Sequence, residues 1–169
     1  IYYGHDEFST AYSRVTPDGV LNGYAGQFMA DDFADRFDSP VVHVKWWGSY
    51  LDNEIIQTVD KFLISFESDV PASATNPFSH PGDPLLNQIV RRGPLAPGSG
   101  TFTETPISAG GPPLDERLYE YNAELHLDKE FFQKPDTVYW LKIVALVDVP
   151  PGTQPGQDPV TRWGWHNRD

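Results

Sequence analysis

Cysteine is absent from the 169-residue chain, so neither a disulfide framework nor a thiolate zinc site can form. Basic residues are also scarce, because 12 Lys and Arg stand against 24 Asp and Glu and give a formal net charge of −12 at pH 7. A nucleic-acid-binding domain is expected to carry a basic face, whereas the one adjacent basic pair here is Arg91–Arg92. The composition therefore argues against nucleic acid as a partner.

Long hydrophobic segments and helical patterns are lacking as well. No apolar run is long enough to cross a membrane, so we expect no membrane span. No segment sustains the 3.6-residue period of an amphipathic helix. The sequence also contains neither a glycine-rich phosphate loop nor a G-x-S-x-G nucleophile motif. A catalytic role is therefore not the favoured interpretation, although it stays open.

The chain is instead rich in strand and turn signals. Sixteen prolines and fourteen glycines separate short segments with alternating apolar and polar residues. The clearest of these segments are Val41–Leu51, Asp60–Val70, Tyr119–Leu125 and Tyr139–Val147. They predict one all-β domain over residues 1–169, an antiparallel two-sheet β-sandwich with jelly-roll-like connectivity. Residues 1–15 are predicted to form an N-terminal arm or an edge strand.

The stretch HVKWWGSYL, residues 43–51, contains two adjacent tryptophans within a predicted strand. Neighbouring side chains of a strand point to opposite faces. The alternation groups Trp46 with Val42 and Val44, and Trp47 with His43 and Lys45. Trp46 is therefore predicted to lie in the core, and Trp47 on the outer face.

Aromatic residues at strand faces or ends are the candidate ligand-binding residues. An exposed aromatic ring can stack against a sugar ring, while nearby polar groups bind the hydroxyls. Trp163 and Trp165 would share one face of a strand in RWGWHNRD, the segment that mixes rings and polar groups most densely. The alternative is that these rings fill the core, because tryptophan is highly buried on average. The candidates are Trp47, Tyr50, Trp140, Trp163, Trp165, His166 and Arg168.

Asp31, Asp32 and Asp35 form an acidic cluster that suggests calcium as a cofactor. Calcium takes six to eight oxygen ligands, often from loop carboxylates and carbonyls. The spacing lacks the glycine and the terminal glutamate of an EF-hand loop. The alternative is that Asp31 or Asp32 caps a turn by accepting hydrogen bonds from nearby backbone N–H groups.

An ordered set of segments resembles a domain of unknown function found in exported, surface-associated proteins of Planctomycetes. The set covers about residues 30–168 and comprises ADDF, HVKWWGSYL, FLISFESDVP, FSHPGDPLL, YEYNAEL, FFQKPDTVYWLKIVAL and RWGWHNR. The resemblance implies an exported β-sandwich at the cell surface. It brings no catalytic residues with it.

Three functions are consistent with these observations. The first is a non-catalytic extracellular module that binds polysaccharide or attaches to a cell-surface component. The second is a self-assembling subunit of a surface layer or filament, in which the N-terminal arm adds a strand to a neighbouring copy. The third is a metal-dependent enzyme acting on carbohydrate, with histidines and carboxylates brought together from distant positions.

Overall fold

The computed structural model describes residues 6–51, 55–108 and 117–166, and the secondary structure of these ranges is strand apart from a 3₁₀ conformation at Leu51. The strands are β1 (Asp6–Phe8), β2 (Thr10–Val15), β3 (Leu21–Gly26), β4 (Ala30–Phe33), β5 (Pro40–Val41), β6 (His43–Tyr50), β7 (Lys61–Val70), β8 (His80–Arg92), β9 (Thr101–Pro106), β10 (Leu118–Glu124), β11 (Phe131–Phe132), β12 (Tyr139–Val147) and β13 (Trp163–His166). The prediction of an all-β chain is confirmed.

One mixed sheet of eleven strands dominates the fold. Its order is β1-β13-β6-β10-β9-β8-β7-β12-β2-β3, and β4 pairs with β12 outside this path. A separate two-stranded sheet is formed by β5 and β11. The pairs β2–β12 and β8–β9 are parallel, and the other pairs are antiparallel.

This single mixed sheet corrects the expected antiparallel sandwich with jelly-roll connectivity. Alternation along a strand reports which of its faces is buried. It does not report which strands become neighbours, or whether they run in the same direction. Strands that were expected to divide between two packed sheets are instead hydrogen-bonded into one curved half-barrel.

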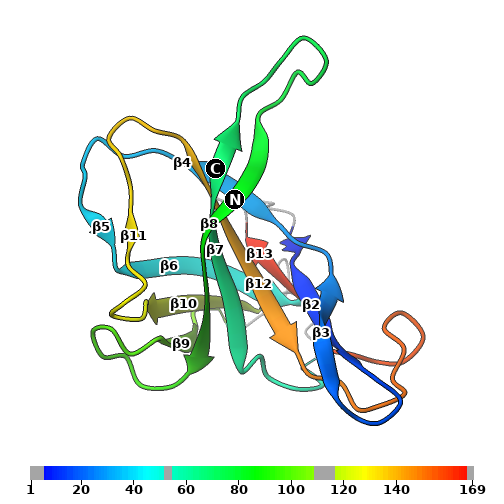
Figure 1. Ribbon diagram of the computed structural model, residues 1–169. Coiled ribbons are helices and arrows are strands. Elements are labelled where there is room, and N and C mark those ends of the chain that lie inside the picture. The colour runs from blue at the N-terminus through cyan, green and yellow to red at the C-terminus, as the bar shows by residue number, and fades with distance from the viewer. Residues whose placement is uncertain (1–5, 52–54, 109–116, 167–169) are drawn as a thin grey trace.

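Strong curvature brings β13, near one end of the large sheet, close to β12, in its other half. In Figure 1, β6 and β10 run across the direction of β7 and β12, so the two halves of the sheet face each other. The chain between β1 and β2 links these halves, because Ser9 donates its N–H to the Trp163 carbonyl (3.0 Å) and accepts at its own carbonyl from the Ala145 N–H (2.9 Å). The predicted arm is therefore part of this chain's own sheet from residue 6 to residue 15.

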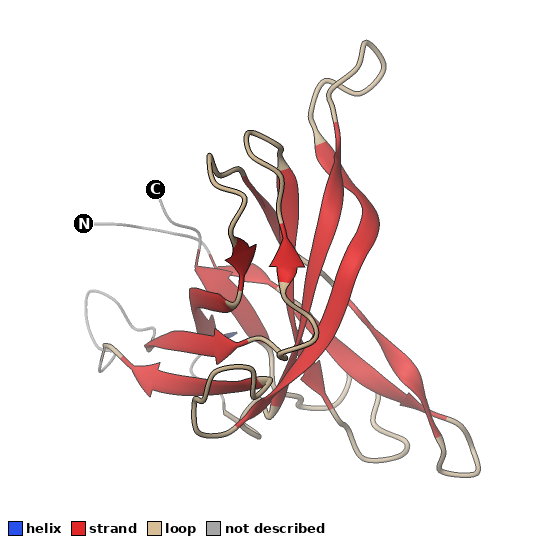
Figure 2. Cartoon of the chain, turned by 60° about the vertical axis from the view of Figure 1, so that its left-hand side comes forward, coloured by secondary structure: helices blue, strands red, loops and turns tan. Residues whose placement is uncertain are grey.

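The longest hairpin of the fold is formed by β7 and β8 and projects beyond the rest of the sheet (Figure 2). The predicted strand at residues 60–70 is confirmed. Its partner β8 begins at His80. Pro81 and Pro84 lie within β8, and the pairing with β7 is irregular near them. Proline has no backbone N–H to donate to a neighbouring strand, so a proline-rich sequence is typical of a loop. Here the chain is nevertheless extended and paired as a strand.

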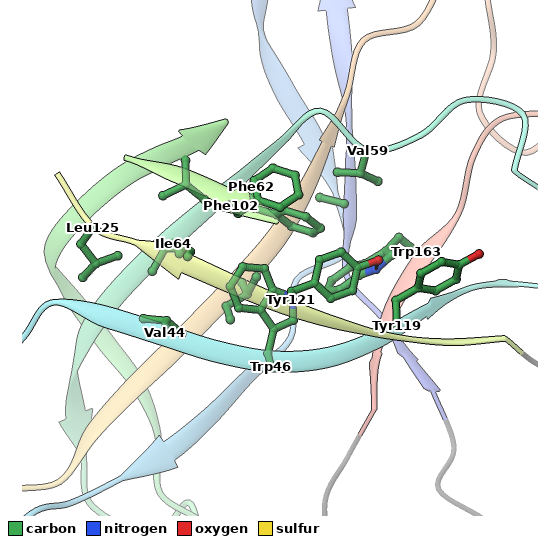
Figure 3. Packing of buried hydrophobic residues seen from close by; sticks show 14 of the residues in the cluster. Val44, Trp46, Val59, Phe62, Ile64, Phe102, Tyr119, Tyr121, Leu125 and Trp163 are labelled. Carbon is green, nitrogen blue, oxygen red and sulfur yellow. Dashed lines mark hydrogen bonds between the residues drawn. The ribbon is translucent and has the colours of Figure 1, made fainter. Parts of the chain in front are cut away.

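Aromatic side chains fill the concave side of the half-barrel (Figure 3). The Trp46 ring stacks on Tyr121 with 5.3 Å between centroids, and Phe62 meets Trp163 edge to face at 4.8 Å. Such pairs add to the free energy gained by burying apolar surface. The prediction that Trp46 belongs to the core is confirmed, since it is 4% exposed, whereas Val42 lies between β5 and β6 and is 44% exposed.

A buried polar network crosses this aromatic core. The Glu104 carboxylate accepts hydrogen bonds from the hydroxyls of Tyr50 (2.7 Å) and Tyr121 (2.9 Å). It also pairs with the Arg92 guanidinium at 3.1 Å. The Trp163 indole N–H donates to the Tyr121 hydroxyl at 2.9 Å. Each of these polar groups has a partner, as buried polar groups must if they are not to destabilise the fold.

Alkaline pH is expected to destabilise the protein through its buried tyrosines. Burial raises the pKa of Tyr12 to about 12, and burial together with the Glu104 charge raises the pKa values of Tyr50 and Tyr121 above their usual range. The unfolded chain loses these protons near the ordinary tyrosine pKa of about 10. Stability from the three phenols is therefore fully present below about pH 10 and is lost as the pH rises toward the folded-state pKa values.

Urea unfolding near neutral pH and at about pH 11 measures this loss, with tyrosinate absorbance reporting ionisation. Tyr12→Phe removes one titrating group, so its free energy of unfolding should fall less between the two pH values. Equal unfolding midpoints for the unsubstituted protein at both pH values would contradict the prediction.

Candidate functional site

A hollow of about 200 Å³ lies where the half-barrel does not close, and it is called the seam hollow below. Residues of β4, β6, β12 and β13 line it. They are Asp31, Asp32, Phe33, Lys45, Trp46, Trp47, Leu141, Ile143, Trp165 and His166. Five predicted site residues from three separate strands are therefore brought to one place.

The seam hollow arises because two strands share one edge of β12. Along this edge β4 pairs with residues 139–142, and β2 pairs with residues 145–147. Between them, the Ile143 carbonyl accepts hydrogen bonds from the Ser9 hydroxyl (2.6 Å) and the Trp165 indole N–H (2.8 Å). Here β4 and the β1–β2 segment separate, which leaves β6 and β13 on one side of the opening and β4 on the other.

Trp46 and Trp47 approach the hollow from the two faces of β6. The β6–β10 pairing runs from His43 to Ser49 without a register shift, so alternation is kept through Gly48. Gly48 permits close packing, because a Cβ there would lie 2.5 Å from both the Gly164 carbonyl oxygen and the Trp163 ring. Trp46 is buried and Trp47 is half-buried, as the alternation predicted.

The indole N–H of Trp46 is the unusual polar group of this wall. Within residues 6–51, 55–108 and 117–166, its Nε1 is the one buried side-chain nitrogen or oxygen without a hydrogen-bond partner. A buried donor left unpaired costs about 1 to 3 kcal/mol. Because this nitrogen is buried, its cost falls on the stability of the core beside the hollow.

Trp47 is held within a polar ladder on the outer face of β6 and β10. Lys45 Nζ lies 5.3 Å from the centre of the Trp47 ring and 2.8 Å from a Glu120 oxygen. Asn122 donates to the other Glu120 oxygen at 3.0 Å. These contacts orient Lys45 over the ring, and the Lys45 ammonium lowers the pKa of Glu120 by hydrogen bonding to it. These contacts therefore hold the Trp47 ring in place, and part of the ring stays accessible.

Trp165 and His166 form the β13 side of the hollow. Trp165 pairs with Glu7 of β1 and with Gly48 of β6, and it packs against the edge of the core. The expectation that Trp163 and Trp165 share a face agrees with the packing, but Trp163 is fully buried and Trp165 is half-buried. His166 is half-buried and is engaged in an interaction of its own.

The acidic cluster divides between two places. Asp31 and Asp32 line the seam hollow, and the Asp32 N–H donates to an Asp31 carboxylate oxygen at 3.0 Å. The Asp35 carboxylate accepts from the N–H groups of Arg36 (2.6 Å) and Phe37 (3.3 Å), the capping role that the alternative had given to Asp31 or Asp32. In the described part of the chain, no three His, Cys, Asp or Glu side chains are grouped so that they could hold a metal ion. Calcium stays an untested prediction.

The other candidate residues do not line the hollow. Tyr50 is 1% exposed and Trp163 is 0% exposed, and both are hydrogen-bonded within the core network, so neither ring can face a ligand. The half-buried Trp140 lies on the outer face of β12, where its indole N–H donates to Asp69 at 2.8 Å. Arg168 lies outside the described residues.

The chain was compared with known proteins. The model of the family described as "Domain of unknown function (DUF7901)" matches residues 3–169. The chain belongs to this family. No curated protein and no solved structure matched the chain. The part of this family member that the structure describes contains no helix of a length and hydropathy suited to spanning a membrane.

Sequence reasoning missed the residues that complete the hollow. Lys45 and Trp46 come from β6, and Leu141 and Ile143 come from β12. Alternation correctly marks Trp46 and Ile143 as core residues, but it carries no sign that they border an opening. Such a sign requires knowing that β4 and β2 divide the edge of β12, which depends on long-range pairing.

Proposed function

We propose that this domain is a non-catalytic module that binds polysaccharide outside the cell, and that the seam hollow is its binding site. The observation that carries the proposal is the convergence of Trp47 and Trp165 with Asp31 and Asp32 around one hollow.

The rings supply the apolar part of such a site. Sugar rings present C–H groups that pack against aromatic faces, and two half-buried tryptophans border the hollow. The volume of about 200 Å³ lies below the roughly 300 to 1,000 Å³ of pockets that enclose a whole drug-sized ligand. A site of this size suits one unit of a polymer whose remainder stays in solvent.

The polar groups supply the directional part. A sugar hydroxyl both donates and accepts, so it can donate to Asp31 or Asp32 and accept from a nearby donor. Lys45 supplies such a donor above the Trp47 ring.

Trp47→Ala is expected to weaken polysaccharide binding by about tenfold or more, because a central ring contact often contributes most of the affinity of a site. Affinity electrophoresis and titration calorimetry against soluble xylan, mannan, mixed-linkage glucan and chitin oligomers measure the change. The variant should remain folded because Trp47 is half-buried and lies on the outer face of β6.

Trp140→Ala is the matched control, since Trp140 is also a half-buried tryptophan of an outer face but does not border the hollow. It should leave the affinity unchanged. Equal weakening by the two substitutions would place binding elsewhere, and no binding to any glycan of the panel would overturn the proposed function.

A further inference from the structure

A second hollow adjoins the seam hollow and is called the rim hollow below. Its volume is about 240 Å³, and Glu7, Met29, Ala30, Asp31 and Trp165 line it. Asp31 and Trp165 border both hollows. The two hollows are therefore neighbours that share one tryptophan and one carboxylate, from β13 and β4.

We infer that the site takes a chain of at least two sugar units that lack acidic groups, with one unit in each hollow and the linkage beside Trp165. This inference rests on the proposed function and adds the length and the charge of the ligand. Neither hollow alone reaches the size of a pocket for a whole small molecule, whereas the pair offers two neighbouring places of similar volume.

Trp165 is suited to the position between the two units. Its indole N–H is bonded to the Ile143 carbonyl at 2.8 Å, which fixes the orientation of the ring. Its backbone is paired on both sides, with Glu7 and with Gly48. A ring held in this way loses little conformational freedom when a ligand packs against it, so preorganisation favours binding.

The charge of the lining decides against an acidic chain. Asp31, Asp32 and Glu7 contribute three carboxylates to the two hollows, and all three residues are exposed. Lys45 is the one lysine or arginine among the described lining residues, and it is already paired with Glu120. A uronate or sulfate group would therefore meet like charge, in a protein of net charge −12. Hydroxyl groups can donate to the same carboxylates.

The test is titration calorimetry with oligosaccharides of one, two and four units, built from glucose, mannose or N-acetylglucosamine, and with oligogalacturonates of the same lengths. For the neutral series that binds, we expect the dimer to bind about tenfold more tightly than the monomer. Oligogalacturonates should bind more weakly than the neutral series, and the difference should shrink in Asp31→Asn and at high salt.

Glu7→Ala separates the two hollows, because Glu7 borders the rim hollow and does not border the seam hollow. It should reduce the affinity for the dimer more than the affinity for the monomer. Equal affinity for monomer and dimer, or preferred binding of oligogalacturonates, would overturn the inference while the proposed function stands. Absence of binding to every sugar would overturn both.

Discussion

Trp163→Ala is expected to lower the free energy of unfolding by about 3 to 5 kcal/mol, the range measured when a large buried aromatic side chain is truncated. Trp163 is 0% exposed and meets the rings of Phe62 and Tyr121 edge to face, at 4.8 and 5.6 Å between centroids. Its indole N–H also donates to the Tyr121 hydroxyl. The substitution leaves a cavity in the middle of the core and removes a buried hydrogen bond (Figure 3).

Chemical denaturation followed by far-ultraviolet circular dichroism measures this loss, because the signal does not depend on the tryptophan that is removed. Trp140→Ala is the control and should cost clearly less, since Trp140 is only half-buried. Trp163→Phe keeps most of the packing, so its free energy of unfolding can be measured instead if the alanine variant does not fold. A stability of Trp163→Ala equal to that of the unsubstituted protein would contradict the buried position.

Glu104→Ala is expected to cost about 3 to 5 kcal/mol, the usual result of removing one partner from a buried ion pair. The side chain of Glu104 is 9% exposed. It accepts hydrogen bonds from Tyr50 and Tyr121 and forms an ion pair with Arg92. Its loss leaves two buried hydroxyls without their acceptor, whereas the Arg92 guanidinium keeps the Val59 carbonyl. The effect should lie toward the lower end of the range, because the Arg92 side chain is 32% exposed and can be partly hydrated.

The outer face of the sheet offers a control for Glu104. Glu120→Ala breaks the ion pair with Lys45, whose side chain is 44% exposed, and exposed pairs contribute little to stability. Its unfolding midpoint should be almost unchanged. Glu104→Gln should fall between the two, since the amide oxygen still accepts hydrogen bonds but carries no charge. Similar losses for Glu104→Ala and Glu120→Ala would show that the core network does not stabilise the fold.

The two adjacent tryptophans of HVKWWGSYL show how much local pattern could predict. Alternation assigns Trp46 to the core and Trp47 to the outer face, and both predictions hold because the pairing of β6 with β10 has no register shift. The same reasoning cannot tell how far along a strand burial continues. Tyr50 and Trp163 were candidates for ligand binding, and both lie in the core because the opposite half of the sheet covers them.

The all-β class and most of the strands follow from the sequence alone, because the period of two and the turn residues are local properties of the chain. The identity of neighbouring strands is a long-range property, and only the tertiary structure decides it. Ser9 joins β13 to β12, and β4 and β2 divide one edge of β12. That division leaves the opening at which Asp31, Trp47 and Trp165, distant in sequence, come together. No local sequence pattern encodes this opening, because it results from β4 and β2 pairing with different stretches of the same edge of β12.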